Sequence, residues 1–208
     1  MANEVQGNYS LSFARRCVNE NSAEGRKLLI LRVSVGSTGF INGHWREQGD
    51  CYIRMMNVCH YALSLNPNNR LRGLLWHQGE SDAVEKVSFE MHYNNLSRLV
   101  NSVRKEFSAP ELPFVAGDFV HQWKDENMEI CRPVVRAIRA FCENDMYSGF
   151  VETDGLKSNF QELGRETQCG REVIKDTIHF SRRSLYVLGE RYYDAWKKII
   201  RNCENRYV

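Results

Sequence analysis

Two kinds of hydrophobic pattern alternate along the 208 residues of the chain. Short apolar runs that are rich in branched residues and bounded by turn-forming residues predict buried β-strands. These strands are expected at residues 28–35, 71–76, 113–117 and 149–152. Longer stretches with apolar residues three or four positions apart predict helices. The helices are expected at residues 12–20, 51–65, 89–107, 133–143 and 181–202.

The alternation of strands and helices predicts an α/β fold with a mainly parallel sheet. In such sheets the loops beyond the carboxyl ends of the strands gather on one side and carry the functional groups. The loops at Gly36, Gln78 and Gly117, and the loop after Glu152, are therefore expected to open on that side. The length of the chain predicts a single domain over residues 1–208.

Composition and charge narrow the classes of function. The net charge is only +2, and the basic residues are scattered among acids, which argues against a nucleic-acid partner. No apolar run approaches the roughly 20 residues of a membrane span, and the polar start of the chain shows no signal peptide. The seven cysteines contain no C-x-x-C pair. We expect mostly buried thiols in a reducing, cytoplasmic setting, with disulfides in a secreted protein as the alternative.

The first candidate for chemistry is the pair Asp176 and His179, just before the last predicted helix. A carboxylate three residues before a histidine can hydrogen-bond the imidazole and fix its tautomer. It can also stabilise the imidazolium when the histidine acts as a general base. The alternative interpretation of so short a pattern is an aspartate and a histidine that lie near each other on the surface without a catalytic role.

Two further loops carry polar groups at the ends of predicted strands. The loop from Gly36 through Ser37 and Thr38 has backbone N–H groups suited to an oxyanion, or is simply a tight connection that needs glycine. In the second loop, Gln78 has an amide that can donate to a developing negative oxygen, and Glu80 can orient a neighbouring group.

Together these loops resemble the sialate O-acetylesterase (SASA) branch of the SGNH hydrolases. Residues 73–82 (GLLWHQGESD) are similar to the signature of that branch. Residues 35–39 (VGSTG) are similar to its Gly-Gly-Thr loop, with Ser37 in place of the second glycine, and residues 176–180 (DTIHF) resemble its final block. The resemblance implies a three-layer α/β/α sandwich with the flavodoxin-like SGNH sheet.

The resemblance also implies a function, which is the release of acetate from O-acetylated carbohydrates by a Ser-His-Asp mechanism. His179 would be the base and Asp176 its orienting acid. The Gly36 backbone and the Gln78 amide would help to form the oxyanion hole, with Glu80 as support. Weaker substrate-binding candidates are Ser37, Thr38 and His77. Neither a metal nor an organic cofactor is implied, and nucleic acid and membranes are not expected partners.

The nucleophile is the part of this pattern that the chain does not show. The family's serine lies in a Gly-Gln-Ser-Asn type motif after the first strand, and only six mostly polar residues precede Gly7. We therefore expect a domain that is incomplete at its N-terminus and lacks the first strand. The chain is then a fragment, is completed by a second chain, or has lost hydrolysis. Possible substitutes for the serine are weak: Ser10, Ser12, Ser37 and Ser81.

The alternative function is a catalytically inactive carbohydrate-binding or interaction module on the same scaffold. Sugar sites use exposed aromatic rings beside polar groups, for which Trp45, Trp76 and Trp123 are candidates. Packing in the core is the competing role for each of these tryptophans.

Overall fold

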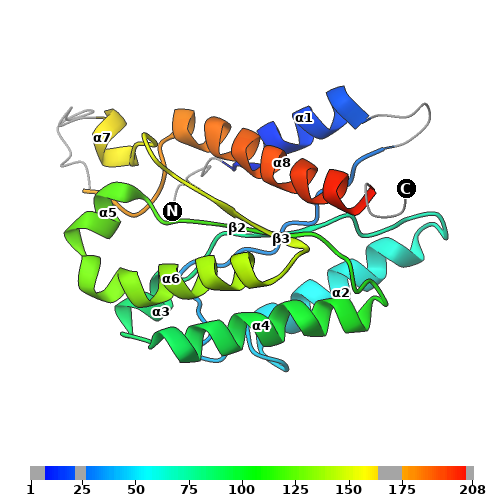
Figure 1. The fold of residues 1–208 in the computed structure, drawn as a ribbon, viewed down its shortest axis with the longest axis horizontal. Coiled ribbons are helices and arrows are strands. Elements are labelled where there is room, and N and C mark those ends of the chain that lie inside the picture. Colours follow the sequence, from blue (N-terminus) through cyan, green and yellow to red (C-terminus); the bar gives the residue numbers. More distant parts are fainter. Residues whose placement is uncertain (1–7, 22–26, 164–174, 205–208) are drawn as a thin grey trace, which may run out of the picture.

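The structure is a computed structural model that describes residues 8–21, 27–163 and 175–204. Its sheet has three parallel strands in the order β1, β2, β3. The strands are β1 (Leu74–Trp76), β2 (Phe114–Gly117) and β3 (Ser148–Val151). In the middle strand Phe114, Val115 and Ala116 are fully buried, because helices cover both faces of the sheet (Figure 1). This three-layer α/β arrangement confirms the predicted fold class.

The helices divide between the two faces of the sheet. On one face lie α1 (Ser10–Asn21) and α8 (Arg182–Glu204), and on the other lie α4 (Phe89–Glu106) and α6 (Met128–Asn144), with α2 (Asp50–Ser64) beside α4 (Figure 1). Each strand is followed by a short helix. These are α3 (Glu80–Val84), α5 (His121–Glu126) and α7 (Asn159–Leu163). Five or six residues are too few to show a helical period, so the sequence pattern did not predict these three helices.

The predicted strand at residues 28–35 is wrong. The segment forms neither strand nor helix, and Leu29 and Val35 are 61% and 43% exposed. An apolar run becomes a strand only where a neighbour pairs with its N–H and C=O groups. Among the described residues β1 pairs with β2 alone, and nothing pairs with residues 28–35. The apolar pattern therefore predicted a strand where the described residues supply no partner.

Smaller corrections concern element boundaries. The second predicted strand begins only at Leu74, and α6 begins five residues before Pro133, which lies inside it. The turn that starts α6 is set by the Cys131 N–H, which donates to the Asn127 carbonyl at 3.1 Å. None of the described helices combines the length and apolar character needed to cross a membrane. The described cysteines form no disulfide with one another, and Cys169 lies outside the described residues.

The contact between α1 and α8 sets the position of the helix layer above β2 and β3. Phe13 of α1 packs edge-on against Trp196 of α8 at 5.9 Å between ring centroids. The backbones approach so closely at Gly189 that an added Cβ would lie 2.0 Å from the Tyr9 carbonyl oxygen and 2.1 Å from Ser12 Oγ. Only glycine fits there, because both neighbours are held by the first turn of α1.

We predict that Gly189→Ala lowers the free energy of unfolding by about 1–3 kcal/mol, because the added methyl group must push α1 from α8. Denaturant titration measures the change. Gly36→Ala is the matched control, since a Cβ there meets nothing within 4 Å. Equal stability of the two variants would contradict the packing argument.

Candidate active site

The loop of residues 36–41 is tied to the motif that follows β1. The Gln78 side-chain amide donates to the Thr38 carbonyl. The carboxylate of Asp82 accepts the backbone N–H groups of Phe40 at 3.2 Å and Ile41 at 2.8 Å. Two loops that are about 40 positions apart in the sequence therefore form one unit at the carboxyl end of β1.

The turn of this motif depends on its glycine. Gly79 has φ of +148°, in the region that favours glycine, and an added Cβ would lie 3.0 Å from the Phe119 ring and from Val134. The indole N–H of Trp76 donates to the Gln78 carbonyl at 3.1 Å and holds the start of the turn. Glu80 then begins α3 directly after the turn.

Asp176 and His179 form a hydrogen-bonded pair. The carboxylate of Asp176 lies 3.0 and 3.1 Å from His179 Nδ1 and also accepts the His179 backbone N–H at 3.0 Å. Its second oxygen accepts the Asn159 side-chain amide at 2.8 Å. Burial by itself would raise the pKa of Asp176, but the hydrogen bonds from Asn159 and His179 together outweigh it and hold this pKa below its ordinary value.

Backbone contacts place this pair next to the segment after β3. The Asn159 N–H donates to the His179 carbonyl and the Phe160 N–H to the Asp176 carbonyl, each at 2.9 Å. Nδ1 of His179 faces Asp176, so Nε2 lies on the far side of a ring whose side chain is 59% exposed. A neutral histidine held in this way can accept a proton at Nε2.

Two contacts bring the pair to the motif after β1. The ring of Phe180 packs edge-on against His77 with 5.3 Å between centroids. Desolvation raises the pKa of Glu80, and the backbone N–H groups of Glu80 and Gly79 and the nearby His179 offset part of that rise. The charge of His179 acts on Glu80 only as a small part of this balance, so the Phe180–His77 contact is the direct link between the pair and the motif.

His77 is held neutral in the core beneath this region. Tyr192 donates its hydroxyl hydrogen to the Trp76 carbonyl at 2.7 Å, so its oxygen accepts from His77 Nδ1 at 2.8 Å. This assignment leaves His77 Nε2 as an acceptor, and it is buried without a hydrogen-bond partner among the described residues. Burial lowers the pKa of His77 to about 4.

Asp82 has a structural role that the motif alone did not reveal. Its carboxylate is fully buried, with His92 Nδ1 at 3.1 Å and the chain at Gly39 so close that a Cβ would lie 2.7 Å from Oδ1. Phe40 then stacks on Trp76 at 5.6 Å. No spacing in the sequence links Asp82 to His92 on α4, which is why this support escaped sequence reasoning.

In the loop of residues 36–41, called the glycine loop below, the unusual backbone conformation does not fall on glycine as expected. The left-handed backbone conformation falls on Ser37, with φ of 58°, and Gly36 is exposed with ordinary φ. The Thr38 hydroxyl is buried, donates to the Val35 carbonyl at 2.8 Å and accepts from the Trp45 indole at 3.0 Å. Thr38 thus shapes the loop with its side chain and its carbonyl.

The serines considered as substitutes do not complete the pair. Ser12 is buried between α1 and α8 and donates its hydroxyl to the Tyr9 carbonyl at 3.2 Å, while Ser81 lies within α3. Within residues 8–21, 27–163 and 175–204, no serine hydroxyl is hydrogen-bonded to His179. The nucleophile is therefore not identified among the described contacts.

The tryptophans weighed as sugar platforms are core residues. Trp45, Trp76 and Trp123 are only 5%, 4% and 8% exposed. A ring must present a face to solvent in order to stack on a sugar, so these residues do not favour the binding-module alternative.

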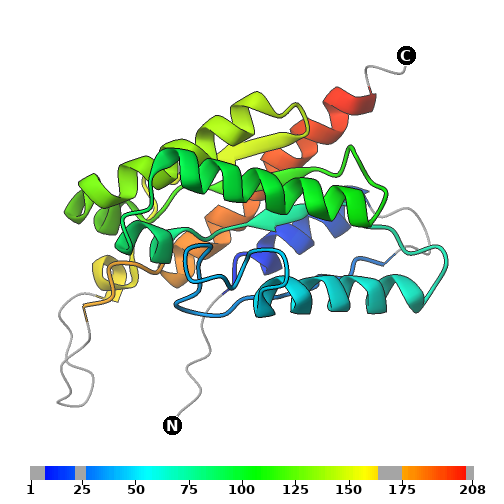
Figure 2. The same cartoon turned by 90° about the horizontal axis from the view of Figure 1, so that it is seen from below.

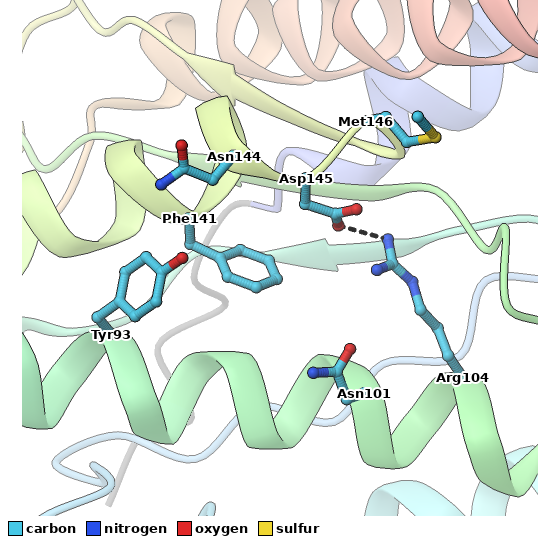
Figure 3. A pocket seen from close by; sticks show the side chains of 7 residues that line it. All are labelled: Tyr93, Asn101, Arg104, Phe141, Asn144, Asp145 and Met146. Carbon is cyan, nitrogen blue, oxygen red and sulfur yellow. Dashed lines mark ion pairs between the residues drawn. The ribbon is translucent and has the colours of Figure 1, made fainter.

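A pocket of about 320 Å³ lies at the amino end of β3, next to the chain that leads into that strand (Figure 3). The candidate loops lie at the other end of the strands, their carboxyl ends. The charged groups of the pocket are engaged, because Arg104 pairs with Asp145 at 2.7 Å and donates twice to the Leu112 carbonyl. The residues lining it are Tyr93, Asn101, Arg104, Phe141, Asn144, Asp145 and Met146. The pocket is thus separate from the loops that carry the candidate chemistry.

The Asp–His pair and the polar loops thus lie at the carboxyl ends of a parallel sheet, where ligand sites of α/β proteins form, and the pair has the geometry of a general base with its orienting acid. The family model described as "Carbohydrate esterase, sialic acid-specific acetylesterase" matches residues 3–198. The chain belongs to this family, as the resemblance of its three loops predicted. The family's description points to carbohydrate acetylesterase activity and to a sugar substrate.

Individual proteins resemble the chain in sequence or in fold. The chain is 29% identical over 96 residues to a probable carbohydrate esterase of Arabidopsis thaliana, covering 46% of this chain and 36% of that protein. A crystal structure of that Arabidopsis protein matches 74% of this chain with a TM-score of 0.55 and 18% identity. The crystal structure of NanS matches 76% with a TM-score of 0.62 and 16% identity. This chain spans 55% of each solved chain.

We predict that Asp82→Asn destabilises the protein by about 1–3 kcal/mol, because the amide NH₂ turns a buried donor toward one of the two backbone N–H groups. Thermal and denaturant unfolding measure the loss. Asp125→Asn on the exposed face of α5 is the control. A loss no larger than in this control would show that Asp82 does not hold the loop.

We also predict a pH dependence from His77. The folded pKa of about 4 lies below the ordinary value near 6.5, so acid protonates the unfolded chain first. Protonation of His77 in the unfolded chain alone therefore lowers the free energy of unfolding as pH falls from about 6.5 to 4, by about 3 kcal/mol in all. The free energy of unfolding of His77→Gln should fall less steeply over that window. Identical slopes for the two proteins would refute the assignment.

Proposed function

We propose that this chain is part of a carbohydrate O-acetylesterase that releases acetate from O-acetylated sugars by a Ser-His-Asp mechanism. The observation that carries the proposal is the hydrogen-bonded Asp176–His179 pair, whose neighbour Phe180 packs on His77 of the motif after β1. The family's description supports the same chemistry.

In the proposed reaction a serine hydroxyl attacks the acetyl carbonyl while His179 Nε2 takes its proton. Asp176 stabilises the resulting imidazolium. The negative oxygen of the tetrahedral intermediate accepts hydrogen bonds from the Gly36 N–H and from the Gln78 amide hydrogen that does not point to Thr38. His179 then protonates the departing sugar oxygen, and water releases acetate from the serine by the reverse sequence.

We propose that the serine arrives on a strand that pairs with the open side of β1. Three observations support this position. Among the described residues β1 is paired on one side only, residues 28–35 are unpaired with several apolar side chains exposed, and His77 Nε2 is a buried acceptor with no donor. The strand comes from a longer form of the protein or from a second chain. The solved relatives, which are longer than this chain, are consistent with the first source.

We predict that His179→Ala lowers acetate release by about a hundredfold or more, since it removes the general base. His60→Ala is the matched control. His60 also pairs with a carboxylate, that of Glu106 at 2.7 Å, but it lies on α2 and not among the candidate loops. Acetate released from acetylated sugars and p-nitrophenyl acetate hydrolysis are the measurements.

The assay is run on these 208 residues and on the chain extended by any continuous upstream reading frame. Activity that appears only in the extended form would support the added strand. Equal rates for the wild type and His179→Ala in an active form would refute the role of His179. A folded, extended protein that carries the serine motif but releases no acetate would refute the esterase itself.

A further inference from the structure

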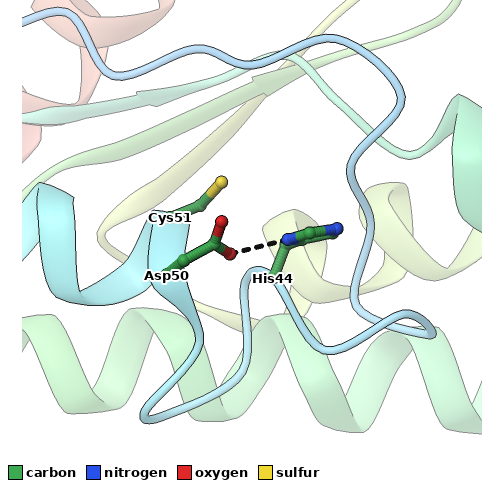
Figure 4. A group of neighbouring side chains, drawn as sticks. All are labelled: His44, Asp50 and Cys51. Carbon is green, nitrogen blue, oxygen red and sulfur yellow. Dashed lines mark hydrogen bonds and ion pairs between the residues drawn. The ribbon is translucent and has the colours of Figure 1, made fainter.

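Three potential metal ligands converge where residues 36–49 meet the amino end of α2. Figure 4 shows the side chains of His44 and Asp50 facing each other, with the Cys51 thiol beside the Asp50 carboxylate. His44 Nδ1 lies 2.6 Å from Asp50 Oδ1, and the nitrogen, oxygen and sulfur donors all lie within 4.8 Å of one another. Figure 2 shows this loop across the start of α2. None of the three residues belongs to the candidate active site.

Backbone contacts that are independent of any ion hold the three residues together. The Tyr52 N–H of α2 donates to the His44 carbonyl at 3.1 Å. Gly49 lies so close to the loop that an added Cβ would sit 2.2 Å from the Gly43 carbonyl oxygen and 2.4 Å from that of His44. Gly43 has φ of +87°, which lets the chain turn back toward α2. The donors are therefore brought together before a ligand arrives, and this lowers the cost of ordering a site.

We propose that His44, Asp50 and Cys51 bind one Zn²⁺ ion through one imidazole nitrogen, one carboxylate oxygen and one thiolate sulfur. This mixed donor set suits zinc, whereas calcium and magnesium take oxygen ligands. Zinc bonds of about 2.0–2.3 Å place neighbouring tetrahedral donors roughly 3.3–3.6 Å apart. His44 Nδ1 and Asp50 Oδ1, now 2.6 Å apart, must therefore separate by about 1 Å to hold the ion, which side-chain rotation allows.

The charges and protons balance at this site. The Cys51 thiol gives up its proton to solvent on binding, and the hydrogen between His44 Nδ1 and Asp50 moves through solvent to His44 Nε2, which leaves Nδ1 free to bind the ion. Cys51 is 2% exposed, whereas the side chains of His44 and Asp50 are 36% and 72% exposed. The ion thus has a buried sulfur on one side, and water can fill the fourth position on the open side. Burial raises the pKa of the Cys51 thiol, so acid will compete with zinc for this ligand.

The proposed ion joins the loop to α2. Trp45, the residue after His44, donates to the Thr38 hydroxyl, and Thr38 carries the carbonyl bound by Gln78. Zinc would therefore stabilise the fold around the glycine loop. The site stands apart from the proposed esterase function, because its ligands and its test do not involve acetate release.

The test is calorimetric titration of the chelator-treated protein with zinc chloride alone, together with thermal unfolding. We expect one ion per chain and a higher melting temperature with zinc. His44→Ala, on a half-exposed side chain, should weaken binding by at least about tenfold. With cobalt(II) in place of zinc, a thiolate-to-metal charge-transfer band should appear in the wild type and vanish in Cys51→Ser.

Two matched variants serve as controls. His60→Ala removes a histidine that pairs with the carboxylate of Glu106 and is not one of the three proposed ligands. Cys59→Ser removes a cysteine of α2, the helix that also carries Cys51. Both should bind zinc like the wild type. Absence of saturable binding at one ion per chain would overturn the proposal. It would also be overturned if His44→Ala bound as tightly as the wild type, or if the controls lost binding equally. Because His44→Ala alters no buried group, the test stands even if Cys51→Ser fails to fold.

Discussion

The arrangement of the candidate site depends on the hydrogen bonds that the buried carboxylate of Asp82 accepts from the backbone of residues 40 and 41. A buried carboxylate needs hydrogen-bond donors, and Asp82 finds them in the N–H groups of Phe40 and Ile41. His92 Nδ1 of α4 lies 3.1 Å from the same carboxylate, so contacts from a loop and from α4 meet at one side chain. The position of the glycine loop relative to Gln78 follows from this constraint.

The second constraint is the open side of the sheet. Central parallel strands are normally paired on both sides, because their backbone groups are otherwise removed from water without partners. Here β2 has two neighbours and β1 has one among the described residues. Among the same residues the apolar segment 28–35 has no strand partner and His77 Nε2 has no hydrogen-bond donor. The strand proposed above would pair with β1 and would carry the nucleophile.

The sequence predicted the main helices and three strands because each shows its buried face as a local hydrophobic period. In the structure these faces pack against one another. It also pointed to the carboxyl ends of the strands, where Gln78, Glu80, Asp176 and His179 lie. It did not reveal Asn159 or Tyr192, which support Asp176 and His77 from helices with no motif of their own. Long-range hydrogen bonds leave no spacing that a single sequence can show.

By itself the sequence determined the α/β class, the longer helices, three of the strands and the family, since these rest on hydrophobic period and on short contiguous motifs. Only the tertiary structure decided that residues 28–35 stay unpaired, that three tryptophans are buried and that Asp82 is a buried support. The physical reason is the same in each case. Pairing, burial and charge compensation depend on which distant groups are present in space, and a residue's own sequence neighbours do not specify them.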